Sequence, residues 1–186
     1  MEGNILLFIQ ENLRNPICDP IMTAITHLGD GGIFWIILTI LLLCFKRTGR
    51  AGIYSVCALI GALTVNNIIL KNLVNRTRPY EVVEGLKCLV GMAHDASFPS
   101  GHTGTAFASS VAICRQIPKK WAIFFLVLAG VIALSRLYVG IHYPTDVLGG
   151  LFTGVCIGVL VNVVGDRVYD SRESGTETEM KDGTFG

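Results

Sequence analysis

Ala51–Leu70 reads AGIYSVCALIGALTVNNIIL, a stretch without one charged side chain. A bilayer core about 30 Å thick is crossed by roughly 20 helical residues, so this stretch is long enough to span it. Ala96–Cys114 and Val147–Gly165 have the same apolar character and a similar length. None of the three alternates apolar and polar residues at every second position, which argues against membrane β-strands and predicts transmembrane helices.

The composition of the whole chain agrees with a membrane location. Of the 186 residues, 51% are apolar and 16% are charged, whereas charged residues make up about a quarter of an average soluble protein. The mean hydropathy is +0.56. These values exclude an ordinary soluble domain, a disordered chain and a nucleic-acid-binding protein with a basic face. The 6 cysteines are interpreted as small apolar residues of the helices.

Two shorter charge-free runs and one marginal segment complete the predicted bundle. Residues 31–45 and 121–135 reach spanning length if the basic side chains beside them extend to the interface. Residues 16–28 predict a further short helix, ended by the turn Gly29–Gly32. The expected fold is therefore an all-α integral membrane protein with six transmembrane helices in one bundle, preceded by a short amphipathic N-terminal helix.

This pattern divides the chain into three parts. Residues 1–15 are expected to form an amphipathic segment at the membrane interface, and residues 16–165 the membrane domain. Residues 166–186 are polar and predict a disordered tail. Basic residues gather in two short loops, and loops of this kind face the cytoplasm: Lys46, Arg47, Arg50, Arg115, Lys119 and Lys120. With six spans, both termini would be cytoplasmic.

Three polar clusters interrupt the apolar chain, at Lys71–Tyr80, Phe98–Thr103 and Ser135–Asp146. They fall at the end of the third predicted span, at the start of the fourth, and between the fifth and sixth. Because successive spans alternate in direction, all three clusters are expected on the same membrane face. Segments distant in sequence can therefore form one site.

The residue types in these clusters predict a phosphate site. Lys71, Arg78 and Arg136 place three cations near the membrane boundary, where charge is costly and usually functional. Arginine forks match phosphate oxygens, and lysine adds a point charge. Ser100 and Gly101 precede a helix whose free amides and positive dipole end attract an anion. Together these groups describe a phosphate cradle.

Two histidines and one carboxylate supply the groups that phosphoryl transfer requires. His142 and His102 fit the roles of nucleophile and acid. Asp146 lies four residues after His142, where its carboxylate can orient the ring. No cluster of acids and histidines has metal-ligand spacing, so the cations are expected to neutralise the phosphate without a metal.

The three clusters resemble the signature KX6RP–PSGH–SRX5HX3D of the type 2 phosphatidic acid phosphatase superfamily, with every spacing matched between Lys71 and Asp146. The resemblance implies a lipid phosphatase domain over residues 16–165 that uses no metal or other cofactor and faces outward from the cell membrane. It also implies residue roles: His142 as a nucleophile that forms a phosphohistidine, Asp146 as its orienting acid, His102 as the proton donor, and Lys71, Arg78, Ser100, Gly101 and Arg136 as phosphate binders.

The expected function is the dephosphorylation of a membrane lipid phosphate or diphosphate. Undecaprenyl diphosphate is favoured by analogy over phosphatidylglycerophosphate and phosphatidate. The alternatives are a lipid-phosphate carrier or transporter that cleaves nothing, and a soluble haloperoxidase-like use of the same anion site, which the apolar spans exclude. The expected partners are the bilayer and its lipid phosphate, and the oligomeric state is left open.

Outside the signature, three features have plain structural interpretations. Arg76 is interpreted as an interfacial anchor, and His27 near Asp30 as a turn residue. His94 and Asp95 are interpreted as parts of a solvated loop.

Overall fold

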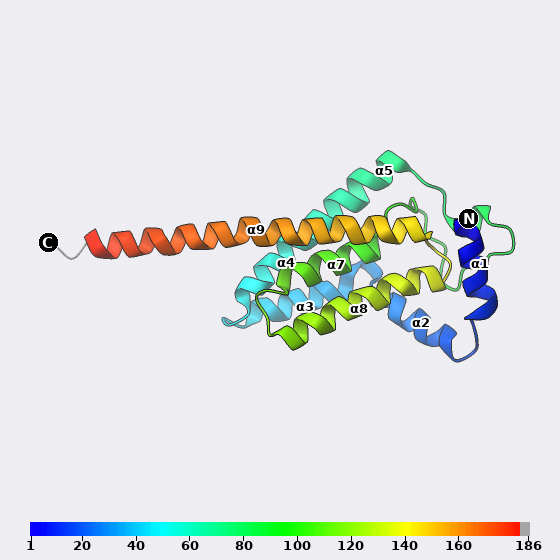
Figure 1. Ribbon diagram of the computed structural model, residues 1–186, viewed down its shortest axis with the longest axis horizontal. Helices are drawn as coiled ribbons and strands as arrows, with labels where there is room; N and C mark the ends of the chain where they lie inside the picture. The colour runs from blue at the N-terminus through cyan, green and yellow to red at the C-terminus, as the bar shows by residue number, and fades with distance from the viewer. Residues whose placement is uncertain (183–186) are drawn as a thin grey trace.

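The computed structural model describes residues 1–182, with side chains as far as Ser171, and every regular element in that range is helical (Figure 1). The elements are α1 (Glu2–Asn12), α2 (Cys18–His27), the 3₁₀ turn η1 (Asp30–Gly32), α3 (Ile33–Cys44), α4 (Gly49–Ala62), the π-helix η2 (Leu63–Leu70), α5 (Lys71–Val74), α6 (Pro79–Val82), α7 (Gly101–Ile113), α8 (Lys119–Tyr138) and α9 (Pro144–Asp182).

Helix α7 is the centre of the bundle and packs against α3, α4, α8 and α9. Its small side chains allow this close packing, and Ala106, Ala108 and Ala112 are fully buried. At Gly154 of α9, an added Cβ atom would lie 2.5 Å from the carbonyl oxygen of Gly104. Glycine is therefore required where α9 crosses α7.

Three helices of the described range are long and apolar enough to cross a membrane: Gly49–Val82, Lys119–Tyr138 and Pro144–Ser171. The pair Cys18–His27 and Asp30–Cys44, bent by 46°, makes a fourth if it counts as one span. This is fewer than the six predicted. One reason is that the segment expected to begin at Ala96 is non-helical up to Ser100, so α7 has only 13 residues.

Helix α1 and the far end of α9 lie at opposite ends of the structure (Figure 1), whereas the six predicted passes would bring the two ends of the chain to one side. Glu2 bonds to Thr145 at the start of α9, whereas α9 itself carries the chain away from that end. Six full passes would return the chain to its starting side. Helix α2, within the segment over residues 16–28, is instead the first half of the bent pair.

The polar C-terminal segment also differs from the prediction. Helix α9 continues beyond Gly165 to Asp182, where the sequence indicated a disordered tail from residue 166. The chain contains no proline after Pro144, so nothing forces the helix to end where its apolar part ends. Residues 183–186 lie outside the described range.

Candidate active site

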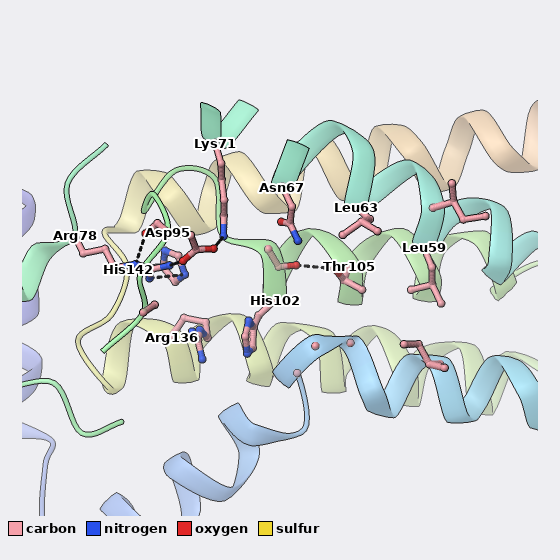
Figure 2. A pocket seen from close by; sticks show the side chains of 17 residues that line it. Leu59, Leu63, Asn67, Lys71, Arg78, Asp95, His102, Thr105, Arg136 and His142 are labelled. Atoms are coloured by element: carbon pink, nitrogen blue, oxygen red, sulfur yellow. Dashed lines mark hydrogen bonds and ion pairs between the residues drawn. The ribbon is translucent and has the colours of Figure 1, made fainter. Parts of the chain in front are cut away.

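A pocket of about 470 Å³ lies at the end of the bundle where α7 begins and α8 ends. Figure 2 shows its two contrasting ends. Polar side chains of the predicted site line one end: Lys71, Arg78, His102, Arg136 and His142. Apolar side chains from α3, α4 and η2 line the other: Ile36, Leu59, Ile60 and Leu63. The pocket is therefore amphipathic along its length.

The three predicted cations come from three separate elements and are all buried. Lys71 begins α5, Arg78 is the N-cap of α6, and Arg136 lies in the last turn of α8. Their exposed fractions are 8%, 3% and 4%. Burying a cation is costly unless a partner neutralises it, so this cluster selects an anion. Nε of Arg136 is buried without a hydrogen-bond partner in the part of the chain described.

The first turn of α7 faces the same pocket. Ser100 is its N-cap, and its hydroxyl accepts a hydrogen bond from the Thr103 hydroxyl at 3.0 Å. The amide of Ser100 donates to the carbonyl oxygen of Asp146 at 2.9 Å, which ties the start of α7 to α9. Gly101 lines the pocket, so the backbone amides of this turn lie next to the cation cluster.

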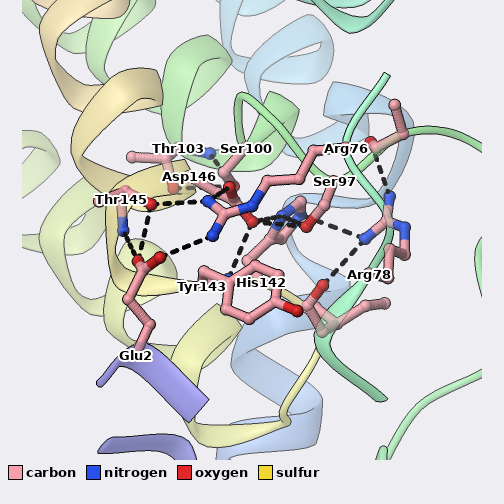
Figure 3. Close-up of polar contacts among 12 residues, drawn as sticks. Glu2, Arg76, Arg78, Ser97, Ser100, Thr103, His142, Tyr143, Thr145 and Asp146 are labelled. Atoms are coloured by element: carbon pink, nitrogen blue, oxygen red, sulfur yellow. Dashed lines mark hydrogen bonds and ion pairs between the residues drawn. The ribbon is translucent and has the colours of Figure 1, made fainter. Parts of the chain in front are cut away.

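His142, which lines the pocket, lies beside Asp146 (Figure 3). Nδ1 of His142 is 3.6 Å from Oδ2 of Asp146, close enough for an ion pair but too long for a hydrogen bond. Oδ2 accepts hydrogen bonds from the Ser97 hydroxyl at 2.5 Å and the Tyr143 amide at 2.9 Å. Nε2 of His142 points toward Arg78, with 3.5 Å between Nε2 and Nη1.

The environment keeps the His142 ring neutral. Burial is the main cause that lowers the pKa of His142, to about 3, and the nearby charges of Arg136 and Arg78 act in the same direction. Asp146 opposes them. A neutral imidazole has a free lone pair, which a nucleophile requires.

Arg76, interpreted from the sequence as an interfacial anchor, is part of this arrangement. Its Nη1 donates to Oδ1 of Asp146 at 2.7 Å, and its Nη2 donates to Glu2 at 2.6 Å (Figure 3). Its guanidinium carbon also lies 3.9 Å from the centre of the Tyr143 ring. Arg76 therefore links the N-terminal helix to the carboxylate beside His142. The only sequence signal for this role was that Arg76 is a third basic residue in the first polar cluster, beside Lys71 and Arg78.

Asp95, interpreted from the sequence as a solvated loop residue, reaches the cation cluster. One carboxylate oxygen bonds to Lys71, and the other accepts from Nη2 of Arg78 at 2.5 Å. Burial raises the pKa of Asp95, but its hydrogen bonds and charge interactions with Lys71 and Arg78 outweigh burial and lower the pKa to about 2. The carboxylate thus stays charged at neutral pH and offsets one of the two positive charges.

His102 lines the pocket and contacts a residue from the α2–α3 turn. Its Nε2 lies 2.8 Å from Oδ1 of Asp30, and the other Asp30 oxygen lies 2.6 Å from Nδ1 of His27. The sequence interpretation placed His27 and Asp30 in a turn, and both do lie at the turn, but it did not connect them with His102.

The structure brings all the predicted site residues to one end of the bundle. Six of them line the pocket: Lys71, Arg78, Gly101, His102, Arg136 and His142. Ser100 and Asp146 lie behind them as the helix cap and the partner of His142. Among the described residues, no group of three or more histidines, cysteines and acids is placed to hold a metal ion.

Comparison with known proteins identifies the family and similar proteins. The family model described as PAP2 superfamily matches residues 51–169. An undecaprenyl-diphosphatase of Sulfolobus acidocaldarius is 34% identical over 126 residues, which cover 68% of this chain and 61% of that protein. Undecaprenyl-diphosphatase BcrC of Bacillus subtilis is 36% identical over 150 residues, which cover 79% of this chain and 75% of BcrC. The chain thus spans about three fifths of the archaeal relative's length.

Solved structures show the same fold. Aquifex aeolicus LpxE superposes with a TM-score of 0.76 at 26% identity, covering 85% of this chain and 92% of LpxE. A transmembrane PAP2-type phosphatidylglycerolphosphate phosphatase of Bacillus subtilis also gives 0.76, at 27% identity, covering 90% of this chain and 85% of that one.

Proposed function

Since the chain belongs to the PAP2 superfamily, we propose that it dephosphorylates a membrane lipid phosphate or diphosphate without a metal, through a phosphohistidine on His142. The observation that carries the proposal is the pocket itself. Its cationic end offers two histidines and a helix N-terminus to a phosphate, and its apolar end suits a lipid chain. A substrate with a phosphate head and an apolar tail matches both ends.

The reaction has two balanced steps. In the first, Nε2 of His142 attacks phosphorus, the new P–N bond forms, the P–O bond to the lipid breaks, and His102 protonates the departing oxygen. In the second, His102 takes a proton from water, whose oxygen attacks phosphorus and releases His142 with inorganic phosphate. Lys71, Arg78, Arg136 and the α7 amides offset the charge on the phosphoryl oxygens throughout.

Asp146 acts through His142. Its carboxylate orients the ring and stabilises the positive charge that develops on the imidazole when the phosphohistidine forms. The 3.6 Å separation is compatible with this role, since catalytic contacts often shorten when substrate binds.

Among lipid phosphates, we propose undecaprenyl diphosphate as the preferred substrate. Two of the relatives carry that activity in their names, and both cover two thirds or more of this chain. Phosphatidylglycerophosphate is the second candidate, because Phosphatidylglycerophosphatase B of Bacillus subtilis is 29% identical over 175 residues.

We propose that the pocket opens to the outer face of the cell membrane. Arg47, Arg50 and Arg115 line a common hollow with Asp166, which places the two basic loops at one end of the bundle, away from the active site. Basic loops favour the cytoplasm, so the opposite end is assigned to the outside. On this assignment the N-terminus is outside, with α1 at the interface, and the C-terminus is cytoplasmic.

A phosphate-release panel on purified protein in detergent tests the proposal. The panel contains undecaprenyl diphosphate, undecaprenyl phosphate, phosphatidylglycerophosphate and phosphatidate, with His142→Ala as the inactive control. Release from at least one lipid, and fastest release from undecaprenyl diphosphate, is the expected result. Lipid binding without release of phosphate would instead identify a carrier and overturn the proposed enzyme.

A further inference from the structure

Asp30 lies outside residues 51–169 that match the family model, yet it contacts a histidine of the pocket. From this contact we infer that Asp30 is the positioning residue of His102: it fixes the ring and its tautomer and stabilises its protonated form. The inference rests on the proposed function for the role of His102 as proton donor, and it adds a residue to that role.

The contact with Asp30 determines that Nε2 of the His102 ring carries a hydrogen. An ionised carboxylate only accepts hydrogen bonds, so Nε2 of His102 must carry the proton that lies between it and Oδ1 of Asp30, 2.8 Å away. Nδ1 of His102 has no hydrogen-bond partner among the side chains that the structure describes, which end at Ser171, or among the backbone groups of residues 1–182. Since the ring lines the pocket, Nδ1 is the nitrogen left to serve the leaving group.

The backbone of the α2–α3 turn holds the two groups together. An added Cβ atom at Gly29 would lie 2.4 Å from Cδ2 of His102, so the turn packs directly against the ring. Gly31 and Gly32 follow with φ of 57° and 70°, left-handed values that favour glycine. The turn is therefore built so that Asp30 lies within hydrogen-bond distance of Nε2 of His102.

The charges around His102 explain why a carboxylate is needed there. Burial of the ring is the main effect that disfavours a positive charge on His102, and Arg136 of α8 and Lys71 of α5 act in the same direction. Asp30 is the carboxylate that opposes them, and its second oxygen is held by His27 at 2.6 Å. Without Asp30, a proton donor between two cations would lose its proton more readily.

The proton balance follows from this arrangement. His102 starts with hydrogens on both nitrogens and gives the one on Nδ1 to the lipid oxygen as the P–O bond breaks. The Nε2 hydrogen stays on the bond to Asp30. In the second step Nδ1 recovers a proton from the attacking water, so no outside donor is required.

The test compares Asp30→Asn with Asp170→Asn, a matched change at an exposed acid near the opposite end of the bundle. Asp30→Asn is expected to lower kcat on a lipid phosphate at least tenfold. The loss should not exceed the roughly 10²–10⁴-fold that general acid catalysis contributes as a whole. The alkaline limb of its rate profile should move to lower pH. The burst of phenol from an ester with a very acidic phenol should change little, because that leaving group needs no proton. Asp30→Glu should restore part of the loss.

Nitrogen NMR of histidine-labelled protein provides a test that does not depend on enzymatic activity. When the His102 ring, assigned with His102→Gln, is neutral, it should carry its hydrogen on Nε2 in the natural protein and lose that preference in Asp30→Asn. If the natural protein is active but Asp30→Asn keeps its kcat and pH profile, Asp30 has no positioning role. If no lipid phosphate is cleaved at all, the proposed function fails. Whether or not the protein is active, an unchanged His102 signal in Asp30→Asn would show that Asp30 does not position His102.

Discussion

Nη1 of Arg76 donates a hydrogen bond to Oδ1 of Asp146 at 2.7 Å, across a sequence separation of 70. The other oxygen of Asp146 accepts from Ser97 and from the Tyr143 amide. The carboxylate beside His142 is therefore held on both oxygens, and its orientation depends on an arginine that does not line the pocket.

Arg76→Ala is expected to lower kcat about tenfold to a hundredfold and leave KM nearly unchanged. The lost bond joins two charged groups, and such bonds contribute roughly 1.5–3 kcal/mol. The kcat of Arg76→Lys should fall between those of the natural protein and Arg76→Ala. Arg47 is an exposed arginine at the opposite end of the bundle, and Arg47→Ala should have the kcat of the natural protein. Steady-state kinetics on folded, monodisperse protein gives the answer; an unchanged kcat in Arg76→Ala would contradict it.

Substitution of the two pocket histidines separates nucleophile from acid. His142→Ala should abolish turnover with every leaving group and form no phosphoenzyme. His102→Ala should slow lipid substrates by roughly 10²–10⁴-fold but retain most of the phenol burst with a very acidic phenol ester. Rapid-mixing kinetics on that ester reports the first step alone. A normal burst in His142→Ala with none in His102→Ala would reverse the two assignments.

Asp95→Asn is expected to tighten inhibition by phosphate and vanadate several-fold, because the carboxylate occupies the same two cations that an anion needs. The pKa of Asp95 is lowered to about 2, so this competition is complete above its ordinary pKa of 3.8 and disappears only as pH falls through about 2. Lowering the pH from 8 to 5 should therefore not relieve it. Inhibition constants over that range provide the measurement, with Glu84→Gln in the same loop as control. Weaker inhibition in Asp95→Asn would mean that Asp95 helps to order the cations rather than competing for them.

Chelation is expected to leave activity intact. Lys71, Arg78 and Arg136 supply the positive charge that a metal ion would otherwise bring to the phosphoryl oxygens. The measurement is phosphate release before and after dialysis against EDTA. A loss that added Mg²⁺ restores would show that the cations are not sufficient.

The membrane orientation is tested by single cysteines in a protein whose 6 natural cysteines are replaced by alanine. Glu84→Cys lies at the active-site end and Arg47→Cys at the other, and both positions are exposed. A membrane-impermeant thiol reagent applied to intact cells should label position 84 and spare position 47. The opposite pattern would place the active site in the cytoplasm.

The charge-free stretches were sufficient to predict an all-helical membrane protein, because a helix that satisfies its own backbone is the simplest way for such a stretch to cross lipid. The spacing within the three polar clusters was sufficient to group the site residues, since alternating passes bring the ends of helices to one face. Both signals are patterns within short segments of the sequence. The sequence of this protein therefore determined its helical class and six of the residues that line the pocket.

Only the tertiary structure decided how the N-terminal segment contributes. Glu2, Asp30 and Arg76 meet Thr145, His102 and Asp146 across long sequence separations, and no spacing rule links those pairs. The same is true of the number of passes, because whether α2 crosses the membrane or continues into α3 depends on the 46° bend between them. The local sequence around a charged side chain in a short turn is compatible with several roles. Its actual role depends on which distant charged group the packed helices bring beside it.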